Sequence, residues 1–130
     1  MPKKVLVVDD ELDIRTFIST LLESQGFKTV LAPNGEAGVE KVKSDKPDLI
    51  TLDIMMPQES GIKMYREIKT DPKLKGTPII IISAMAKKTF FHSQKLLDQF
   101  RGEKVPEPEG YIEKPPEPEE LMEAVTKALG

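Results

Sequence analysis

Three short runs of aliphatic residues punctuate the chain, at residues 5–8, 49–52 and 79–82. Each run is nearly continuous rather than alternating with polar residues, which is typical of strands covered on both faces of a parallel sheet. Weaker strand patterns occupy residues 27–33 and 110–114. The pattern therefore predicts five strands.

Between these strands, apolar residues recur at spacings of three and four, the pattern of amphipathic helices. Helices are predicted within residues 14–25, 37–46, 62–68, 87–101 and 118–128. A strand followed by a helix, five times over, predicts an α/β fold with a doubly wound five-stranded parallel sheet and helices on both faces. The 130 residues fit one domain, 1–130.

The composition narrows the classes of function. A net charge of −3 gives no reason to expect nucleic-acid binding. The absence of cysteine excludes disulfides and thiolate chemistry, and one histidine, His92, does not suffice for a multi-histidine zinc site. The apolar runs are too short to span a bilayer, and the first strand begins too early to leave room for a signal peptide. We therefore expect a cytoplasmic protein without a membrane partner.

Polar residues gather where the predicted strands end. Asp9 and Asp10 end the first strand, Asp53 the third, Ser83 the fourth and Lys114 the fifth. Because ligands of such sheets bind beyond the carboxyl ends of the strands, these side chains are expected to converge. Carboxylates without imidazole or thiolate favour a hard cation such as Mg²⁺, and a free carboxylate can act as a nucleophile towards phosphorus.

Each of these residues alone has an ordinary structural explanation. Asp9 and Asp10 alone fit a solvated turn, Ser83 a helix cap, and Lys114 one of many surface lysines. Glu11 is interpreted as a first-turn residue favoured by the helix dipole. Their joint occurrence at the ends of four strands is what favours a functional site.

Four segments, "VLVVDDE", "PDLITLDIMMPQESG", "PIIIISA" and "GYIEKP", resemble the receiver domain of bacterial two-component response regulators. The resemblance covers nearly the whole chain, with the motifs in the family's order. It implies a flavodoxin-like sheet with strand order 2-1-3-4-5. It also implies a phosphoprotein of phosphorelay signal transduction, a signalling module that assists only its own phosphorylation and dephosphorylation.

The resemblance implies a role for individual residues. Asp53 matches the aspartate that accepts a phosphoryl group as an aspartyl phosphate. Together with Asp10 and the backbone carbonyl of Met55, it would hold Mg²⁺ or Mn²⁺, and Asp9 would act through water.

The remaining family positions lie around the phosphoacceptor. Lys114 matches the lysine that contacts the phosphoryl group, and Ser83 the switch hydroxyl. Tyr111 matches the aromatic residue that changes rotamer with it. Pro115 matches a proline whose bond to Lys114 is cis.

The resemblance also implies partners. They are a histidine kinase or histidine phosphotransfer protein, and a downstream protein that binds the face of the fourth helix, fifth strand and fifth helix. The chain would be a monomer or a weak phosphorylation-dependent dimer. Three alternatives stay open: a receiver belonging to a longer regulator with an output domain, a degenerate receiver that binds partners constitutively, and an aspartate-based phosphatase. The phosphatase is disfavoured because Met55 stands where such enzymes carry a second aspartate.

The chain departs from the family pattern at three places, one of which is Pro116, where the family has a bulky hydrophobic residue after Lys-Pro. Gln58 and Glu59 follow the "DIMMP" motif, where the family more often has a hydrophobic residue and then Asp or Asn. The segment of residues 86–109 is longer than is usual, which predicts a longer fourth helix or following loop.

The long segment carries several large apolar residues. One helical face is expected to bury Phe90, Leu97 and Phe100, which leaves Phe91 and Leu96 at least partly exposed. The loop "VPEPEG" is expected to be rigid and acidic and to present this surface without folding onto it. We therefore expect the segment, rather than the phosphorylation site, to select the partner.

Overall fold

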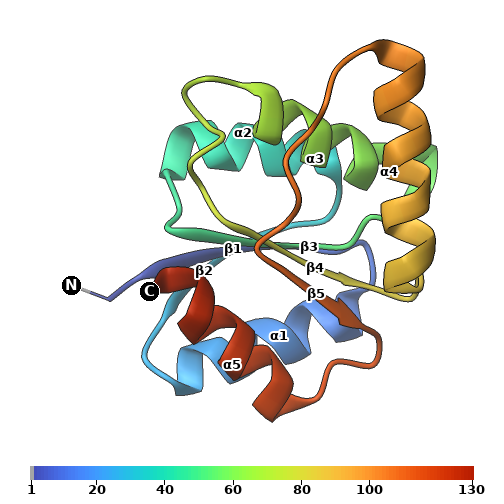
Figure 1. Ribbon diagram of the computed structural model, residues 1–130. Coiled ribbons are helices and arrows are strands. Elements are labelled where there is room, and N and C mark those ends of the chain that lie inside the picture. The colour runs from blue at the N-terminus through green and yellow to red at the C-terminus, as the bar shows by residue number, and fades with distance from the viewer. Residues whose placement is uncertain (1) are drawn as a thin grey trace.

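The computed structural model describes residues 2–130 and confirms the predicted alternation of strands and helices within them (Figure 1). The strands are β1 (Lys4–Val8), β2 (Lys28–Ala32), β3 (Leu49–Leu52), β4 (Ile79–Ser83) and β5 (Gly110–Glu113). The helices are α1 (Leu12–Ser24), α2 (Gly35–Asp45), the short 3-10 helix η1 (Pro57–Glu59), α3 (Ser60–Thr70), α4 (Lys87–Arg101) and α5 (Pro118–Leu129).

The strands form one parallel sheet in the order β2-β1-β3-β4-β5, as the resemblance implied. Helices α2, α3 and α4 lie on one side of the sheet, and α1 and α5 on the other (Figure 1). Successive residues of a strand point to opposite faces, so Leu6 and Val8 join one core while Val5 and Val7 join the other. This burial on both faces explains the continuous aliphatic runs.

Local sequence signals set several helix ends. The side chain of Asn34 accepts a hydrogen bond from the backbone N–H of Ala37 at 2.8 Å, which caps α2. Pro118 starts α5, where its missing N–H costs nothing. Helix α4 ends at Gly102, whose φ of 66° is the left-handed conformation that glycine adopts readily.

The loop between β3 and α3 contains an unusual backbone conformation. Gln58 and Glu59 both have positive φ, 59° and 56°, although neither is glycine. Gly61 then packs against the backbone that follows β3: a Cβ placed on it would overlap the carbonyl oxygen of Asp53. Gly61 is therefore needed for close approach, and the loop before it is held in a strained conformation next to Asp53.

Replacing Glu59 by asparagine should relieve part of this strain, because asparagine tolerates the left-handed region better than glutamate. We expect Glu59→Asn to raise the free energy of unfolding by about 0.5 to 1 kcal/mol, measured by urea denaturation. The control is Lys63→Asn on the exposed surface of α3. It should lower the free energy of unfolding slightly, because asparagine is a poorer helix former than lysine. A loss of stability in Glu59→Asn would show that the side chain of Glu59 contributes more than its backbone costs.

The long segment after β4 is attached to the body of the protein through three residues of α3: Tyr65, Arg66 and Lys69, here called the α3 clamp. The hydroxyl of Tyr65 donates to the carbonyl of Pro106. Arg66 donates to Gln94 Oε1 at 2.7 Å and to Asp98 Oδ1 at 3.1 Å. In this way α4 and the loop that follows it are both bonded to α3.

The third clamp residue fixes the end of the same loop. Lys69 Nζ donates to both carboxylate oxygens of Glu109, at 2.7 and 2.9 Å, and Glu109 Oε1 also accepts the N–H of Ile79 at 2.7 Å. Val105 is buried in the core. The N–H of Val105 also donates to Asp98 Oδ1 of α4 at 3.3 Å. The expectation that the loop would present the surface of α4 without folding onto it was therefore wrong.

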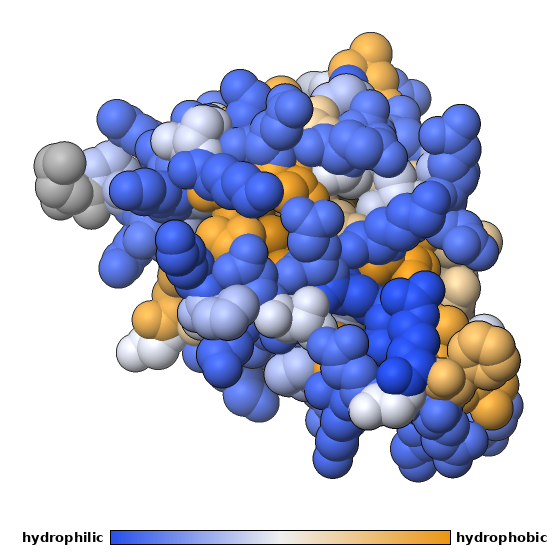
Figure 2. Space-filling model, turned by 90° about the horizontal axis from the view of Figure 1, so that it is seen from above, coloured by the Kyte–Doolittle hydropathy of each residue, from blue (hydrophilic) through white to orange (hydrophobic). Residues whose placement is uncertain are grey.

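The burial of the apolar residues on α4 also differs from the prediction at one position. Phe90 is fully buried and Leu97 half-buried, but Phe100 is 91% exposed. Leu96 is exposed and Phe91 half-buried, as expected. Seen from the side of α2, α3 and α4, polar side chains cover most of the surface, and apolar ones show in hollows and at one edge (Figure 2). Two grooves flank α4: one of about 490 Å³ against α3, and one of about 570 Å³ against residues 104–108.

Within residues 2–130, none of the helices has both the length and the apolar character needed to cross a membrane.

Candidate functional site

The register of the central strands brings the acidic residues together. Val8 on β1 pairs with Leu52 on β3, so Asp9 and Asp53 leave the sheet side by side. Two backbone hydrogen bonds continue the ladder to these residues, from Asp9 N to Ala32 O at 3.2 Å and from Asp53 N to Val8 O at 3.0 Å. The convergence expected at the carboxyl ends of the strands is therefore present.

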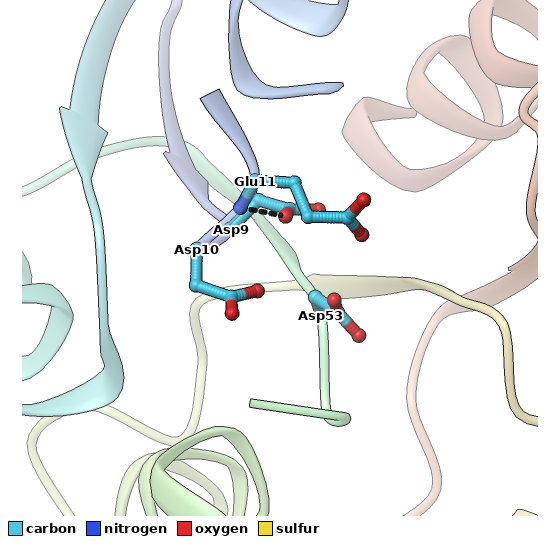
Figure 3. A group of neighbouring side chains, drawn as sticks. All are labelled: Asp9, Asp10, Glu11 and Asp53. Atoms are coloured by element: carbon cyan, nitrogen blue, oxygen red, sulfur yellow. Dashed lines mark hydrogen bonds between the residues drawn. The ribbon is translucent and has the colours of Figure 1, made fainter. Parts of the chain in front are cut away.

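Four carboxylates form this acidic cluster: Asp9, Asp10, Glu11 and Asp53 (Figure 3). Each offers an oxygen, and these oxygens all lie within 4.8 Å of one another. Asp9 and Asp53 are buried, with 1% and 2% exposure, while Asp10 and Glu11 are exposed. Half of the cluster is thus fixed in the protein and half faces solvent.

Backbone amides hold the two buried carboxylates. Asp9 Oδ1 accepts the N–H of Glu11, and Asp53 Oδ1 accepts the N–H of Met55, both at 2.9 Å. The second oxygen of each faces the ammonium of Lys114, which lies 3.1 Å from Asp9 Oδ2 and 3.0 Å from Asp53 Oδ2. Backbone N–H groups and the ammonium of Lys114 therefore hold these oxygens in place without a bound ligand.

Burial and charge shift the pKa values of two members of this site. Burial raises the pKa of Asp9, and the N–H of Glu11 and the ammonium of Lys114 offset this only in part. Burial alone would lower the pKa of Lys114, but its hydrogen bonds to Glu11 and Asp53 raise it above the usual value for lysine. Lys114 is therefore charged at neutral pH and supplies a permanent positive charge beside Asp53.

Lys114, Ser83 and Tyr111 come from the next two strands. The N–H of Lys114 donates to the carbonyl of Ser83 at 2.8 Å, which continues the ladder between β4 and β5. Ser83 is fully buried, and its Oγ accepts the N–H of Met85 at 3.2 Å. The peptide bond between Lys114 and Pro115 is cis.

The hydroxyl of Tyr111 donates to the carbonyl of Met85 at 2.6 Å, at the turn into α4. Its ring lies 5.4 Å from that of Phe90 and 6.3 Å from that of Phe91, measured between centroids. Burial raises the pKa of Tyr111 to about 12, with a further contribution from Glu113. Tyr111 therefore connects β5 with the first turn of α4.

One member of the site, Glu11, was not predicted as such. Its Oε1 lies 2.7 Å from Lys114 Nζ, the shortest of the three distances between this ammonium and a carboxylate. Glu11 is also the N-cap residue of α1, and its side chain caps no backbone group there. The acidic run at residues 9–11 was the only signal for this contact, because 103 positions separate the two partners.

The donor set of the acidic cluster suits a hard divalent cation. Its atoms are carboxylate oxygens, with the backbone of Met55 next to Asp53, and no imidazole or sulfur ligand belongs to it. Mg²⁺ binds through one or two carboxylates and keeps several waters. The exposed side of the cluster, at Asp10 and Glu11, leaves access for those waters.

Comparison with known proteins agrees with this geometry. Residues 5–126 match the family described as "Response regulator receiver domain". The chain is 35% identical over 130 residues to the chemotaxis protein CheY of Thermotoga maritima, with 98% of each chain covered. It is 36% identical over 89 residues to the polar-differentiation response regulator DivK of Brucella anthropi, which covers 68% of this chain and 72% of that protein.

Solved structures show the same fold. The chemotaxis response regulator CheY4 of Vibrio cholerae superimposes with a TM-score of 0.81 at 24% identity, covering 98% of this chain and 99% of that one. Other relatives are longer, and the chain spans about half the length of the phosphate regulon transcriptional regulatory proteins that it also matches. Because the family match extends over nearly all of the sheet and helices that build the acidic cluster, the chain belongs to the response regulator receiver domain family.

Proposed function

We propose that the chain accepts a phosphoryl group on Asp53 from the phosphohistidine of a histidine kinase or histidine phosphotransfer protein. The observation that carries this proposal is the environment of Asp53. It is a buried carboxylate whose two oxygens are held by the N–H of Met55 and the ammonium of Lys114, beside three further carboxylates. This arrangement fixes a nucleophile and provides positive charge where negative charge develops.

The transfer is a substitution at phosphorus. A carboxylate oxygen of Asp53 forms the new bond to phosphorus, the bond from phosphorus to the donor's imidazole nitrogen breaks, and its electron pair stays on that nitrogen. Lys114 stabilises the transferring oxygens by its charge. The hydroxyl of Ser83, which accepts the N–H of Met85 in this structure, then donates a hydrogen bond to a phosphoryl oxygen.

A divalent cation, Mg²⁺ or Mn²⁺, would be held by Asp10, Asp53 and the carbonyl of Met55, with Asp9 acting through water. Bound there, it supplies positive charge that offsets repulsion between the carboxylates and the phosphoryl group. The oxygen-only donor set supports this assignment.

The phosphorylated state would act on partners through α4, β5 and α5. Movement of Ser83 towards the phosphoryl group frees space for Tyr111. The Tyr111 hydroxyl then loses its hydrogen bond to the carbonyl of Met85, which alters the first turn of α4. A ligand shifts such an equilibrium only by its different affinity for the two states. The exposed Phe100 and Leu96 extend this face, so the long segment contributes to the choice of a downstream protein or of a weak dimer.

A phosphatase acting on an outside substrate is not supported by the site. The position two residues after Asp53 is occupied by Met55, whose thioether cannot serve as a general acid. A degenerate receiver is not supported either, because Asp10, Asp53, Ser83 and Lys114 are all present.

Phosphorylation can be tested without knowing the kinase. Incubation of the purified chain with acetyl phosphate and Mg²⁺ should add one phosphoryl group, detected by intact mass spectrometry. The bond should be labile in alkali, as an acyl phosphate is. Transfer from the organism's own histidine kinases, measured with radiolabelled ATP, would then identify the partner. Failure of every donor to label the chain would refute the proposal.

Removal of Asp10 should weaken metal binding most strongly. We expect Asp10→Ala to lower the Mg²⁺ affinity by about tenfold or more, measured by calorimetric titration, because a direct ligand is lost. The same variant should unfold at an equal or higher temperature without Mg²⁺, since one member of a repelling cluster is gone. Asp13→Ala, an exposed acidic residue on the first turn of α1, is the matched control and should leave the affinity nearly unchanged. Unchanged affinity in Asp10→Ala would contradict the metal assignment.

A further inference from the structure

The ammonium of Lys114 is surrounded by three carboxylates. It lies 2.7 Å from Glu11 Oε1, 3.0 Å from Asp53 Oδ2 and 3.1 Å from Asp9 Oδ2. A lysine ammonium has three N–H donors. This one donates hydrogen bonds to Glu11 and Asp53 and forms an ion pair with Asp9. A phosphoryl group on Asp53 therefore competes with these carboxylates for the charge of Lys114.

The three partners differ in how easily they can leave. The side chains of Asp9 and Asp53 are 2% exposed, and each is held by a backbone N–H. The side chain of Glu11 is 58% exposed, and Lys114 is its only hydrogen-bond partner within residues 2–130. A carboxylate at the surface can return to water at low cost, whereas a buried one cannot.

The backbone of Glu11 is fixed while its side chain is not. Its N–H donates to Asp9 Oδ1 at 2.9 Å, and its carbonyl accepts the N–H of Arg15 at 3.0 Å. Rotation of the side chain alone is thus enough to release Lys114. Figure 3 shows that the Glu11 carboxylate extends from the loop after β1 on the same side as that of Asp9.

We infer that Glu11 is a replaceable partner of Lys114: it occupies the ammonium until a phosphoryl group on Asp53 takes its place, and so lowers the affinity of the site for that group. This inference rests on the proposed phosphorylation of Asp53. It gives Glu11 a positioning role that acts through Lys114, distinct from metal binding. A residue that competes with the phosphoryl group sets how far the equilibrium favours the phosphorylated state.

The affinity for beryllofluoride, a non-hydrolysable analogue of a phosphoryl group, measures this competition directly. The full chain would be titrated with beryllofluoride at saturating Mg²⁺ and followed by fluorine NMR. Glu11→Gln keeps the length of the side chain and removes its charge, so we expect it to bind the analogue about two- to fivefold more tightly than the wild type. The ammonium nitrogen resonance of Lys114 should differ between the free wild type and the free variant, and should coincide in the two analogue-bound proteins.

Two controls separate this role from a general effect of charge and from metal binding. Asp13→Asn removes a nearby negative charge that does not contact Lys114, and should change the affinity for the analogue less than Glu11→Gln does. The affinity of Glu11→Gln for Mg²⁺ alone should fall much less than that of Asp10→Ala, because Glu11 is not one of the assigned ligands and its side chain is 58% exposed.

Three results would overturn the role of Glu11: weaker or unchanged binding of beryllofluoride to Glu11→Gln, an equal gain in Asp13→Asn, or a large loss of Mg²⁺ affinity in Glu11→Gln. Absence of beryllofluoride binding to the wild type would instead refute the phosphoacceptor proposal itself, and this inference with it.

Discussion

Replacing Asp53 by asparagine is expected to abolish phosphorylation of the chain by acetyl phosphate. The side-chain amide has nearly the same shape as the carboxylate, but its oxygen carries no negative charge and does not attack phosphorus. Intact mass spectrometry after incubation with acetyl phosphate and Mg²⁺ should show one added phosphoryl group on the wild type and none on Asp53→Asn.

The fold of Asp53→Asn should survive, because the amide oxygen can still accept the N–H of Met55 and one member of a repelling carboxylate cluster is neutralised. Thermal unfolding at an equal or higher temperature than the wild type would separate loss of the nucleophile from loss of structure. Asp13→Asn serves as the control and should be labelled like the wild type. Equal labelling of Asp53→Asn would move the phosphorylation site elsewhere.

The arrangement of strands and helices was predictable because the buried strands of this protein are continuous apolar runs in its sequence. Residues 5–8 are apolar without interruption because β1 lies between β2 and β3 in the sheet and packs on both faces. The outer strand β2 is partly exposed, and its apolar pattern is correspondingly weaker. Alternation alone predicted a parallel sheet, but the order of its strands came from the family resemblance.

The centre of the site was predictable for a topological reason. Asp9, Asp53 and Lys114 each follow a strand directly, so the parallel sheet brings them to one edge whatever their side chains do. Glu11 was interpreted as a first-turn helix residue, because an acidic residue directly before a helical pattern is favoured by the helix dipole. Its pairing with Lys114 depends on side-chain reach across the sheet edge, which no local pattern records.

The error at Phe100 has a geometric cause. Leu97 lies about 20° round the helix from Phe90, but Phe100 lies about 80° round and nearly three turns further along. The α3 clamp holds α4 at Gln94 and Asp98, and Val105 on the returning loop supplies apolar contact to the core. Phe100 therefore projects beyond the helix segment that packs against the protein.

Glu109→Gln should lower the stability of the fold more than the removal of a charge from an exposed ion pair does. Lys69 is 3% exposed, and its ammonium bonds only to Glu109 among the residues from 2 to 130. Glutamine can still accept the N–H of Ile79 but leaves the buried ammonium without a counter-charge. We expect the free energy of unfolding to fall by about 2 kcal/mol in urea denaturation, less than for a fully buried pair because water reaches the Glu109 side.

The double variant Lys69→Met, Glu109→Gln tests that explanation. Removal of the buried charge should restore most of the stability lost in Glu109→Gln, because an unpaired ammonium costs more than an apolar side chain of similar length. The exposed pair of Lys43 and Glu67, with its atoms 4.0 Å apart, offers a matched comparison, and Glu67→Gln should change stability by less than about 0.5 kcal/mol. If the double variant is no more stable than Glu109→Gln, the unpaired charge of Lys69 is not the cause of the lost stability, and the explanation is wrong.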